Sequence, residues 1–562
     1  MQRLKWIFLW IFVGGSFVFA RENSTQNTNN KDDSSRFEIS KQLDIFNALV
    51  KELEIFYVDT IDMQAAVRRG IDAMLSRLDP YTEYIPEDEM EDLKLITTGE
   101  YGGIGAVIRY RDGATIIYDP YEGMPAALAG LKPGDKILSV DDTDATKLSS
   151  DRVSEMLKGL PNTELKLKIQ RPGEKKPRTF EIMRKQIIMD QVTYYGVKDD
   201  SIGYIYLQGF TDKSAEEIKN AFEDLRKNHA ITSLILDLRD NGGGVLEGAV
   251  QTVGYFVPKG TEVISLKGKA DQPERIYRTY NEPVDSLIPL AVLINGGSAS
   301  ASEIVSGALQ DMDRAVLVGQ RSFGKGLVQS PRDLPYGGKL KVTISKYYIP
   351  SGRCIQQLDY THRNPDGSVA AIPDSLTSVF YTTKGRPVRD GGGIRPDVEV
   401  EEEKLPTMLY YLDNDRDFVV FDYVNDWVTK HQTIPSPDLF AYSDEDYEDF
   451  KKIAVEKKFE YDRQSEKMLG TLKEVANFEG FLAEDSTVFA TLEDKLKPDL
   501  ERDLDRYKPE IKRLVASEIV KRYYYLRGQI QYSLRNDKTL EKAMEVLKDR
   551  ELYAKTLSPA EE

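Results

Sequence analysis

The sequence predicts an α/β protein with helical segments at both ends, and two patterns support this fold class. In the middle of the chain, short apolar runs end in glycine-rich turns and lead into helical repeats, as at residues 202–207, 234–239 and 291–294. Repeated strand, turn and helix units indicate a sheet whose faces are covered by helices. Near both ends of the chain, apolar residues instead recur every three or four positions, which is typical of amphipathic helices.

The composition describes a globular protein with several domains. The chain has 562 residues, of which 40% are hydrophobic and 30% are charged. That length is enough for about three or four domains. The net charge of −17 disfavours a nucleic-acid partner. Cys354 is the only cysteine, so no intramolecular disulfide can form and stability must come from packed cores.

The first twenty residues differ in kind from the rest. Arg3 and Lys5 precede a nearly continuous apolar stretch at residues 6–19, and Ala20 follows it. This pattern predicts a cleaved signal peptide over residues 1–20 and therefore an exported protein, with an uncleaved membrane anchor as the alternative. Residues 21–36 are polar and low in complexity, so we expect a disordered linker there.

Residues 37–98 are predicted to be helical. Leu43, Phe46, Val50 and Leu53 follow three- and four-residue spacing, and a second repeat ends at the Leu-Asp-Pro-Tyr-Thr sequence of residues 78–82. Each repeat predicts an amphipathic helix.

Residues 99–186 form a separate module of strands and one short helix. It opens on Gly102, Gly103, Ile104 and Gly105, and continues to the A-G-L-K-P-G-D sequence of residues 129–135. These motifs resemble a PDZ domain. The resemblance implies that the G-G-I-G loop binds a peptide's terminal carboxylate and that the next strand pairs with the peptide. A β-domain without a ligand is the alternative.

The stretch from residue 295 to residue 329 carries the candidate chemistry. An apolar strand ends at a Ser-rich turn before a helix, and the next apolar run leads to Lys325 between two glycines. A serine hydroxyl needs a base to act as a nucleophile. A lysine can be that base once burial lowers its pKa from roughly 10.4 to about 7–8. None of the three histidines stands in an active-site-like context, which disfavours a Ser-His-Asp triad.

Three serines of this turn compete for the role of nucleophile: Ser298, Ser300 and Ser302. Ser300 and Glu303 fit the S-x-x-E capping box, so Ser300 has a purely structural interpretation as a helix cap. The same position also suits a nucleophile, because a helix N-terminus directs N–H groups toward a developing oxyanion.

The sequence N-G-G-S-A-S-A-S-E-I, followed by S-F-G-K-G-L-V-Q, resembles the carboxy-terminal processing (tail-specific) proteases, Ser/Lys peptidases of family S41. The resemblance implies that Ser300 is the nucleophile, Lys325 the base and Gln329 the residue that orients Lys325. It also implies a spiral core like that of the Clp protease and the crotonases.

The glycines that follow Asp240 have two interpretations. The resemblance implies an oxyanion hole formed by the backbone N–H of Ala301 with that of Gly243 or Gly244, whereas a plain tight turn is the structural alternative. The glycine-rich blocks lack the Lys-Ser/Thr of a phosphate-binding loop. No metal or organic cofactor is expected.

The proposed pairing of Lys325 with Gln329 makes a geometric demand. In a straight strand the two residues would lie about 13 Å apart, at roughly 3.3 Å per residue. We therefore predict a tight turn near Gly326.

The domain boundaries that follow are 1–20, 21–36, 37–98, 99–186, 187–401 and 402–562. The last segment is predicted to be helical, with a stripe at Ile511, Val515, Ile519, Tyr523, Leu526 and Ile530. A helical domain packed on the core is favoured over a surface for an adaptor or a second copy.

The predicted function is a serine endopeptidase of the cell envelope, periplasmic by family resemblance, that binds apolar, unstructured protein C-termini through the PDZ domain. Two alternatives remain: a PDZ-based peptide-binding adaptor whose peptidase core is inactive, and a crotonase-like acyl-transfer enzyme.

Overall fold

The computed structural model describes residues 29–90, 97–269, 271–364, 367–413, 417–484, 486–497 and 499–559. The predicted signal peptide and the first part of the predicted linker lie outside these residues. Within the described ranges, no helix combines the length and the apolar character needed to cross a bilayer.

A six-stranded sheet forms the centre of the molecule. Its strand order is β10-β11-β12-β15-β16-β21, and every neighbouring pair is parallel except β10 with β11. The strands are β10 (Tyr194–Lys198), β11 (Ile202–Tyr206), β12 (Ser233–Asp237), β15 (Leu290–Ile294), β16 (Val316–Gly319) and β21 (Val398–Glu399). The apolar runs at residues 202–207, 234–239 and 291–294 thus supply three adjacent strands, and the predicted α/β core is confirmed.

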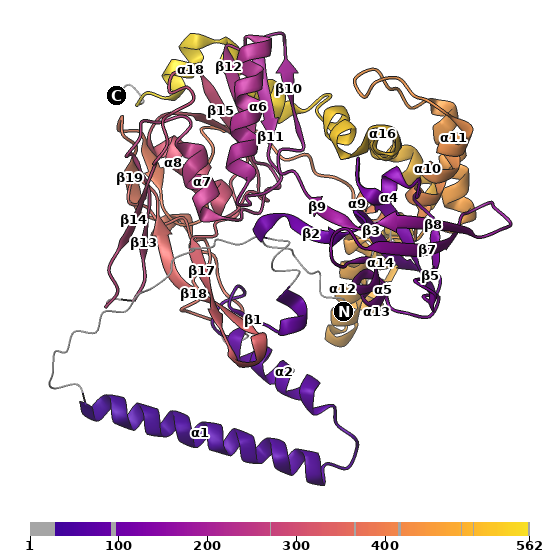
Figure 1. Ribbon diagram of the computed structural model, residues 1–562, viewed down its shortest axis with the longest axis horizontal. Coiled ribbons are helices and arrows are strands. Elements are labelled where there is room, and N and C mark those ends of the chain that lie inside the picture. The colour runs from indigo at the N-terminus through magenta and orange to yellow at the C-terminus, as the bar shows by residue number, and fades with distance from the viewer. Residues whose placement is uncertain are drawn as a thin grey trace.

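Helices from two distant parts of the chain cover this sheet (Figure 1). On one face, side chains of β12 and β15 pack with α6 (Ser214–His229), α7 (Leu246–Val253) and α8 (Ala301–Asp311). On the other face, side chains of β11, β12, β15 and β16 pack with the end of α16 (Lys508–Ser533), with α17 (Lys538–Lys548) and with α18 (Arg550–Thr556). The last helices therefore cover one face of the central sheet, although the predicted boundary at residue 402 assigns them to a separate domain.

A second sheet runs β1-β18-β13-β14, with β17 also paired to β18. It consists of β1 (Glu83–Ile85), β13 (Glu262–Lys267), β14 (Arg275–Arg278), β17 (Leu327–Asp333) and the ten-residue β18 (Lys339–Tyr348). A small pair, β19 (Val379–Tyr381) and β20 (Pro387–Arg389), lies nearby in the sequence. Through β1, the N-terminal segment is part of the same sheet as β17, which begins two residues after Lys325.

The PDZ-like module (residues 99–186) is a sheet of order β3-β4-β5-β7-β8 with its own apolar core. Its elements are β2 (Glu100–Gly103), β3 (Ala106–Arg111), β4 (Ala114–Pro120), α4 (Pro125–Leu128), β5 (Lys136–Val140), β6 (Thr143–Asp144), α5 (Ser150–Leu157), β7 (Glu164–Gln170), β8 (Arg178–Met183) and β9 (Lys185–Ile188). Among the described strands β3 pairs only with β4, so one of its edges has no strand partner.

The helical C-terminal region has a separate core built largely from aromatic and β-branched side chains. Its remaining helices are α9 (Thr407–Asp413), α10 (Val419–Lys430), α11 (Asp444–Glu456), α12 (Gln464–Glu479), α13 (Phe481–Glu484), α14 (Ser486–Leu496) and α15 (Leu500–Arg506). The predicted stripe lies on α16, but this helix is interrupted at Tyr525 (φ 55°, ψ −164°). Ile511 and Ile519 therefore pack in this core, whereas Ile530 packs beneath the central sheet.

The C-terminal region also holds the PDZ-like module. Arg111 of β3 forms two hydrogen bonds of 2.5 and 2.7 Å with Asp422 of α10, and Tyr118 stacks on Phe421 at 4.8 Å between ring centroids. Lys521 of α16 pairs with Asp119 at 2.7 Å. These contacts favour the predicted packing role for the C-terminal helices.

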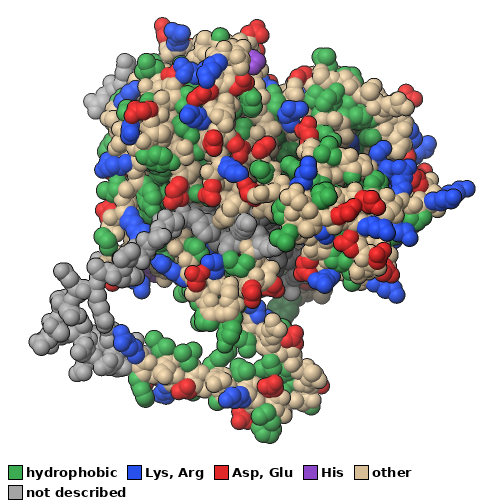
Figure 2. Space-filling view, in the orientation of Figure 1, with side chains coloured by type: hydrophobic (Ala, Val, Ile, Leu, Met, Phe, Trp, Pro, Cys, Tyr) green, Lys and Arg blue, Asp and Glu red, His purple; other side chains and the backbone are tan. Residues whose placement is uncertain are grey.

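The first helix departs from the prediction in two ways. Helix α1 (Asn29–Phe56) begins inside the segment expected to be disordered. Leu43, Phe46 and Leu53 of the predicted amphipathic repeat are 63%, 47% and 39% exposed, and hydrophobic side chains are visible along α1 in Figure 2. Helix α2 (Met63–Leu75) follows and lies near β1.

Candidate active site

The turn between β15 and α8 buries all three candidate serines, but their hydroxyl groups differ. The Ser298 Oγ donates to the Leu238 carbonyl at 2.7 Å, and the Ser302 Oγ donates to the Asn241 carbonyl at 2.8 Å. The Ser300 Oγ is buried and has no hydrogen-bond partner among the described residues. Two of the three hydroxyls therefore have structural roles, and Ser300 alone keeps its hydroxyl for another partner.

The backbone at Ser300 is unusual. Its φ of 60° and ψ of −113° lie in a region that residues with a Cβ seldom occupy and that is concentrated at functional sites. The expected capping box forms only in part, because the Ser300 N–H donates to the Glu303 carboxylate at 2.8 Å while the Ser300 hydroxyl caps nothing.

Glu303 does much more than complete a helix cap. Its fully buried carboxylate accepts hydrogen bonds from four groups: the Ser300 N–H (2.8 Å), the Lys325 N–H (2.9 Å), the Gly324 N–H (2.7 Å) and the Ser322 hydroxyl (2.6 Å). Burial raises the pKa of Glu303, and these hydrogen bonds oppose that rise. One side chain thus joins the Ser300 turn to the Lys325 loop, a role that the S-x-x-E spacing did not reveal.

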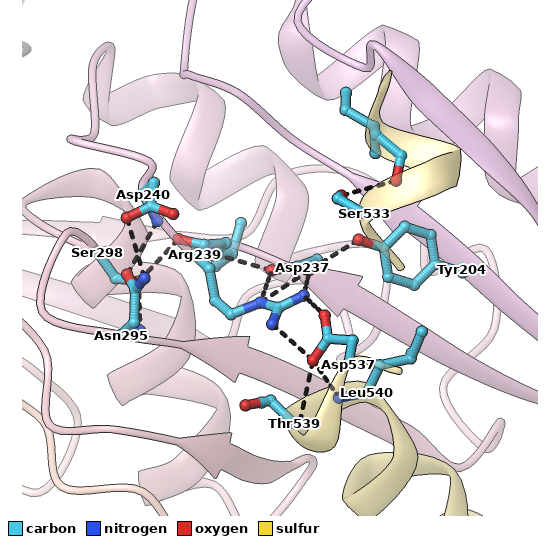
Figure 3. A network of polar contacts seen from close by, with 12 residues as sticks. Tyr204, Asp237, Arg239, Asp240, Asn295, Ser298, Ser533, Asp537, Thr539 and Leu540 are labelled. Carbon is cyan, nitrogen blue, oxygen red and sulfur yellow. Dashed lines mark hydrogen bonds and ion pairs between the residues drawn. The ribbon is translucent and has the colours of Figure 1, made fainter. Parts of the chain in front are cut away.

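Polar contacts also fix the Ser300 turn to the end of β12. Asn295 donates to the Asp240 carboxylate at 3.0 Å and accepts from the Asp240 N–H at 2.9 Å. Figure 3 shows Arg239 between two carboxylates, Asp237 on β12 and Asp537 at the start of α17. The C-terminal region therefore supports the strand end from which the glycine turn begins.

Lys325 lies in the protein interior, with 1% of its surface exposed. Burial, followed by the positive charge of Lys341, lowers the pKa of Lys325 to about 7, against the opposing effects of Glu303, Asp79 and Glu83. Its Nζ lies 4.6 Å from the centroid of the Tyr81 ring. An amine with this pKa is uncharged in a large fraction of molecules at neutral pH.

Gln329 is 1% exposed, and the predicted tight turn before it is wrong. Residues 321–326 have no regular structure, and β17 starts at Leu327. A register shift between Val328 and Gln329 interrupts the pairing of β17 with β18 instead, and such bulges redirect side chains. The Gln329 Nε2 donates to Thr343 at 3.1 Å, whereas its buried Oε1 has no partner in the described part of the chain.

The glycine turn after Asp240 lies against Ser300. A Cβ on Gly243 would come within 2.7 Å of the Ser300 Cβ, and a Cβ on Gly244 would come within 1.9 Å of the Phe210 carbonyl oxygen. Both positions therefore require glycine. The Gly243 N–H already donates to the Asn241 Oδ1 at 2.9 Å, so of the two N–H groups left open by the sequence, that of Gly244 is the better candidate donor.

The four residues expected to bind a peptide carboxylate lie at the start of the PDZ-like module. Gly102 and Gly103 belong to β2 and pair with β9, Ile104 is 3% exposed, and Gly105 has a φ of 71°. The carbonyl groups of Ile104 and Gly105 accept hydrogen bonds from Ala126 and Tyr121. This loop leads directly into β3, whose outer edge has no strand partner among the described strands.

Within the described residues, no group of three His, Cys, Asp or Glu side chains could hold a metal ion. The prediction that no metal or cofactor is needed stays a prediction. The three histidines have partners outside the Ser300 turn. His362 pairs with Asp359, His431 stacks on Trp427, and His229 is half-exposed beside Asp224.

The strained Ser300 backbone predicts an effect on stability. Glycine has no Cβ and adopts this conformation freely, so we expect Ser300→Gly to raise the free energy of unfolding by about 1 kcal/mol relative to Ser300→Ala. Ala308→Gly in the middle of α8 is the control, because glycine there should lower stability by about 1 kcal/mol. Urea unfolding measures all three, and equal stability of the two Ser300 variants would contradict the strain.

Comparisons with known proteins agree with these motifs. A model of peptidase family S41 matches residues 201–369, a PDZ-domain model matches residues 116–171, and a model described as the C-terminal helical domain of a probable PDZ-protease matches residues 408–547. The predicted presence of a PDZ domain and of a helical C-terminal region is thereby confirmed.

The alignments with three curated relatives span most of the length of each relative. The carboxy-terminal-processing protease of Bartonella bacilliformis is 34% identical over 354 residues, which are 62% of this chain and 79% of that protein. A probable CtpA-like serine protease of Staphylococcus haemolyticus is 31% identical over 410 residues, 72% of this chain and 79% of that protein. The carboxy-terminal processing protease CtpB of Bacillus subtilis is 32% identical over 323 residues, 57% of this chain and 67% of that protein. The chain belongs to the carboxy-terminal processing proteases of peptidase family S41.

Proposed function

We propose that this protein is an exported serine endopeptidase that binds unstructured protein C-termini through its PDZ domain and cleaves them with Ser300 and Lys325. The observation that carries the proposal is the arrangement around Glu303. One buried carboxylate oxygen accepts from the backbone of Ser300 and from that of Lys325, the Ser300 hydroxyl is free of structural hydrogen bonds in the described chain, and the pKa of Lys325 is about 7.

The reaction requires only groups that this chain supplies. The Ser300 Oγ attacks the scissile carbonyl carbon while the neutral Lys325 Nζ takes the hydroxyl proton. The resulting ammonium returns that proton to the leaving amine as the C–N bond breaks, which leaves an acyl-enzyme. A water molecule then gives a proton to Lys325 as its oxygen adds to the acyl carbon. The bond between the acyl carbon and the Ser300 Oγ breaks while Lys325 returns that proton to the Ser300 Oγ, which releases the acid product and restores both residues.

The negative charge on the tetrahedral oxygen needs preorganised donors. The proposed pair is the Ala301 N–H at the start of α8 and the Gly244 N–H, since the Gly243 N–H is engaged by Asn241. Each such donor typically contributes about 10²–10³ in rate. Gln329 is proposed to orient Lys325 through its Oε1, which has no partner among the described residues.

The PDZ domain supplies substrate selection in this proposal. The loop from Gly102 to Gly105 would donate N–H groups to the terminal carboxylate of the tail, and the outer edge of β3 would pair with the residues before it. Apolar, unstructured tails suit this mode because backbone pairing needs an extended segment. The C-terminal helices, whose contacts hold β3 and β4, serve as a packing domain rather than as a surface for an adaptor or a second copy.

The wild type and Ser300→Ala should be compared on an unfolded protein that ends in apolar residues, with a C-terminally amidated copy as the matched substrate. We expect the wild type to cleave the free-acid substrate at least about tenfold faster than the amide, because the PDZ loop recognises the carboxylate. Ser300→Ala should cleave neither. Cleavage by Ser300→Ala at the wild-type rate would contradict the protease mechanism, whereas binding without cleavage by the wild type would favour an inactive adaptor. Equal cleavage of acid and amide would contradict tail recognition alone.

A further inference from the structure

Lys325 is enclosed on one side by residues that come from the far N-terminal part of the chain, more than two hundred positions earlier. The segment Asp79–Ile85 joins helix α2 to strand β1, and it precedes the whole PDZ domain. The sequence of residues 78–82 predicted the end of a helix and no contact with Lys325. In the structure, Tyr81 of this segment lies against Lys325, and Thr82 contacts Thr343, which in turn binds Gln329.

The segment is held rigidly by a carboxylate of its own. Asp79, which is 6% exposed, accepts hydrogen bonds from the N–H groups of Tyr81 and Thr82, both at 2.8 Å, and from the Thr82 hydroxyl at 2.9 Å. The Thr82 oxygen in turn accepts from the Thr343 N–H on β18 at 3.2 Å. Thr343 is also the residue that accepts from the Gln329 Nε2 at 3.1 Å. A continuous chain of hydrogen bonds therefore leads from Asp79 to Gln329.

Tyr81 covers the amine of Lys325. The Tyr81 side chain is 5% exposed, and its ring centroid lies 4.6 Å from the Lys325 Nζ. The ring is supported from behind by an edge-to-face contact with Tyr360 at 6.1 Å. A ring in this position has two opposite effects: its face attracts an ammonium, and its bulk excludes the water that an ammonium needs. The attraction is worth about 0.5–2 kcal/mol, whereas burial can lower the pKa of a lysine by up to about 3–5 units, so exclusion of water dominates.

A second lysine stands beside the first. Lys341 on β18 is 4% exposed, and its Nζ pairs with the Glu83 carboxylate at 2.8 Å. Strand β1 brings Glu83 directly opposite Lys341 in the register of the sheet. Burial lowers the pKa of Lys341, and the Glu83 carboxylate opposes that shift. The positive charge of Lys341 disfavours a second positive charge on Lys325. The charged groups facing Lys325 are then Lys341 from β18, Glu303 from α8, and Asp79 and Glu83 from the N-terminal segment.

We propose that the segment Asp79–Ile85 is part of the active site: Tyr81 positions Lys325 and shields it from water, and Glu83 fixes the Lys341 ammonium that keeps Lys325 uncharged. Neither Tyr81 nor Lys341 touches the reacting atoms, so both act through Lys325 as positioning residues. The inference rests on the proposed role of Lys325 as the base. It adds that residues outside the Ser300 turn and the glycine turn set the protonation state of Lys325.

The test is the pH dependence of kcat/KM in four variants. Tyr81→Ala lets water reach the amine, and Lys341→Met removes the neighbouring charge. In each variant the pKa of Lys325 should rise, so the acidic limb should move to higher pH by about one unit. This shift corresponds to about a tenfold loss of kcat/KM at pH 6 and to little loss at pH 9.5. Tyr81→Phe and Lys341→Arg are the matched controls, since they keep the ring and the charge, and both should retain the wild-type limb. An unchanged limb in Tyr81→Ala and Lys341→Met, or a limb moved to lower pH, overturns the proposal.

A second measurement does not depend on catalysis. In the Ser300→Ala background, the urea midpoint should rise between pH 7 and pH 10, because an uncharged buried Lys325 disfavours the folded state whenever the unfolded chain binds the proton. Adding Tyr81→Ala should reduce that rise, and adding Tyr81→Phe should not. An equal rise in all three would overturn the proposed shielding even if Tyr81→Ala is too unstable to assay. If Ser300→Ala itself cleaves like the wild type, the protease proposal fails while this measurement still decides the role of Tyr81.

Discussion

Replacing Lys325 by methionine is expected to lower kcat/KM by at least about 10³-fold and to make the protein more stable at neutral pH. A general base contributes roughly 10²–10⁴ in rate, and Lys325 is the base proposed for Ser300. Cleavage of a tail-bearing substrate by equal amounts of each protein measures the loss. Lys346→Met, on the same strand as Lys341 but exposed, is the control and should keep wild-type activity.

The stability half of this prediction follows from the direction of the pKa shift. The folded-state pKa of Lys325 is about 7, below its ordinary value of 10.5, so between these values the unfolded chain binds more protons. The free energy of unfolding of the wild type should therefore rise with pH from about 7 to about 10.5. A shift of this size corresponds to a burial penalty on the order of 4 kcal/mol at neutral pH. Lys325→Met removes it, and its advantage over the wild type should shrink as pH approaches 10.5.

The same pKa sets the shape of the wild-type activity profile. Below pH 7 Lys325 gains a proton and can no longer accept one from Ser300, so kcat/KM should fall about tenfold per pH unit. Activity of Lys325→Met within tenfold of the wild type, or a wild-type profile without an acidic limb near pH 7, would contradict the role of Lys325 as the base.

Local sequence patterns predicted the elements of the site better than they predicted its connections. The apolar runs before Asn295 and Ser322 became parallel neighbours, β15 and β16, because such runs are buried on both sheet faces. The environment of Lys325 could not be predicted in the same way. Its covering ring, Tyr81, and the neighbouring charge, Lys341, come from segments whose pairing is fixed only by the tertiary fold.

Two errors have a common physical origin. The tight turn at Gly326 was inferred from the straight-strand distance between Lys325 and Gln329, whereas the structure has a register shift between Val328 and Gln329 instead. The stripe on α16 was predicted as one continuous surface, yet the break at Tyr525 divides it between two cores. In both cases long-range packing selects a local irregularity to which hydrophobic periodicity is insensitive.

The sequence pattern around Glu303 predicted only part of the role of this residue. The S-x-x-E spacing predicted the contact with the Ser300 N–H, which forms. The other three donors, at Ser322, Gly324 and Lys325, lie about twenty residues further along the chain. Their contact depends on β16 returning the chain to the start of α8, which a capping motif cannot specify.

Glu303→Gln is accordingly expected to lower both stability and activity. Each carboxylate oxygen accepts two hydrogen bonds, so an amide that replaces one oxygen with an NH₂ group leaves two buried donors without an acceptor. At about 1–3 kcal/mol for each unsatisfied group, the free energy of unfolding should fall by roughly 2–6 kcal/mol. The displaced Ser300 turn and Lys325 loop should also lower kcat/KM by about 10²-fold, since small misplacements of catalytic groups have effects of this size. Glu216→Gln, in the exposed first turn of α6, is the matched control and should change neither quantity.

The pH profile of Glu303→Gln separates misplacement from a change in the charge of Lys325. The Glu303 carboxylate favours the Lys325 ammonium, so its removal should lower the pKa of Lys325 further and move the acidic limb of the residual activity to lower pH. The rate should then remain depressed at pH 9, where Lys325 is uncharged in both proteins. Wild-type activity at pH 9, together with activity above that of the wild type at pH 6, would mean that Glu303 acts through charge alone. If the carboxylate holds Ser300 and Lys325 in position, we expect a loss of kcat/KM at every pH, together with an acidic limb that lies at lower pH than in the wild type.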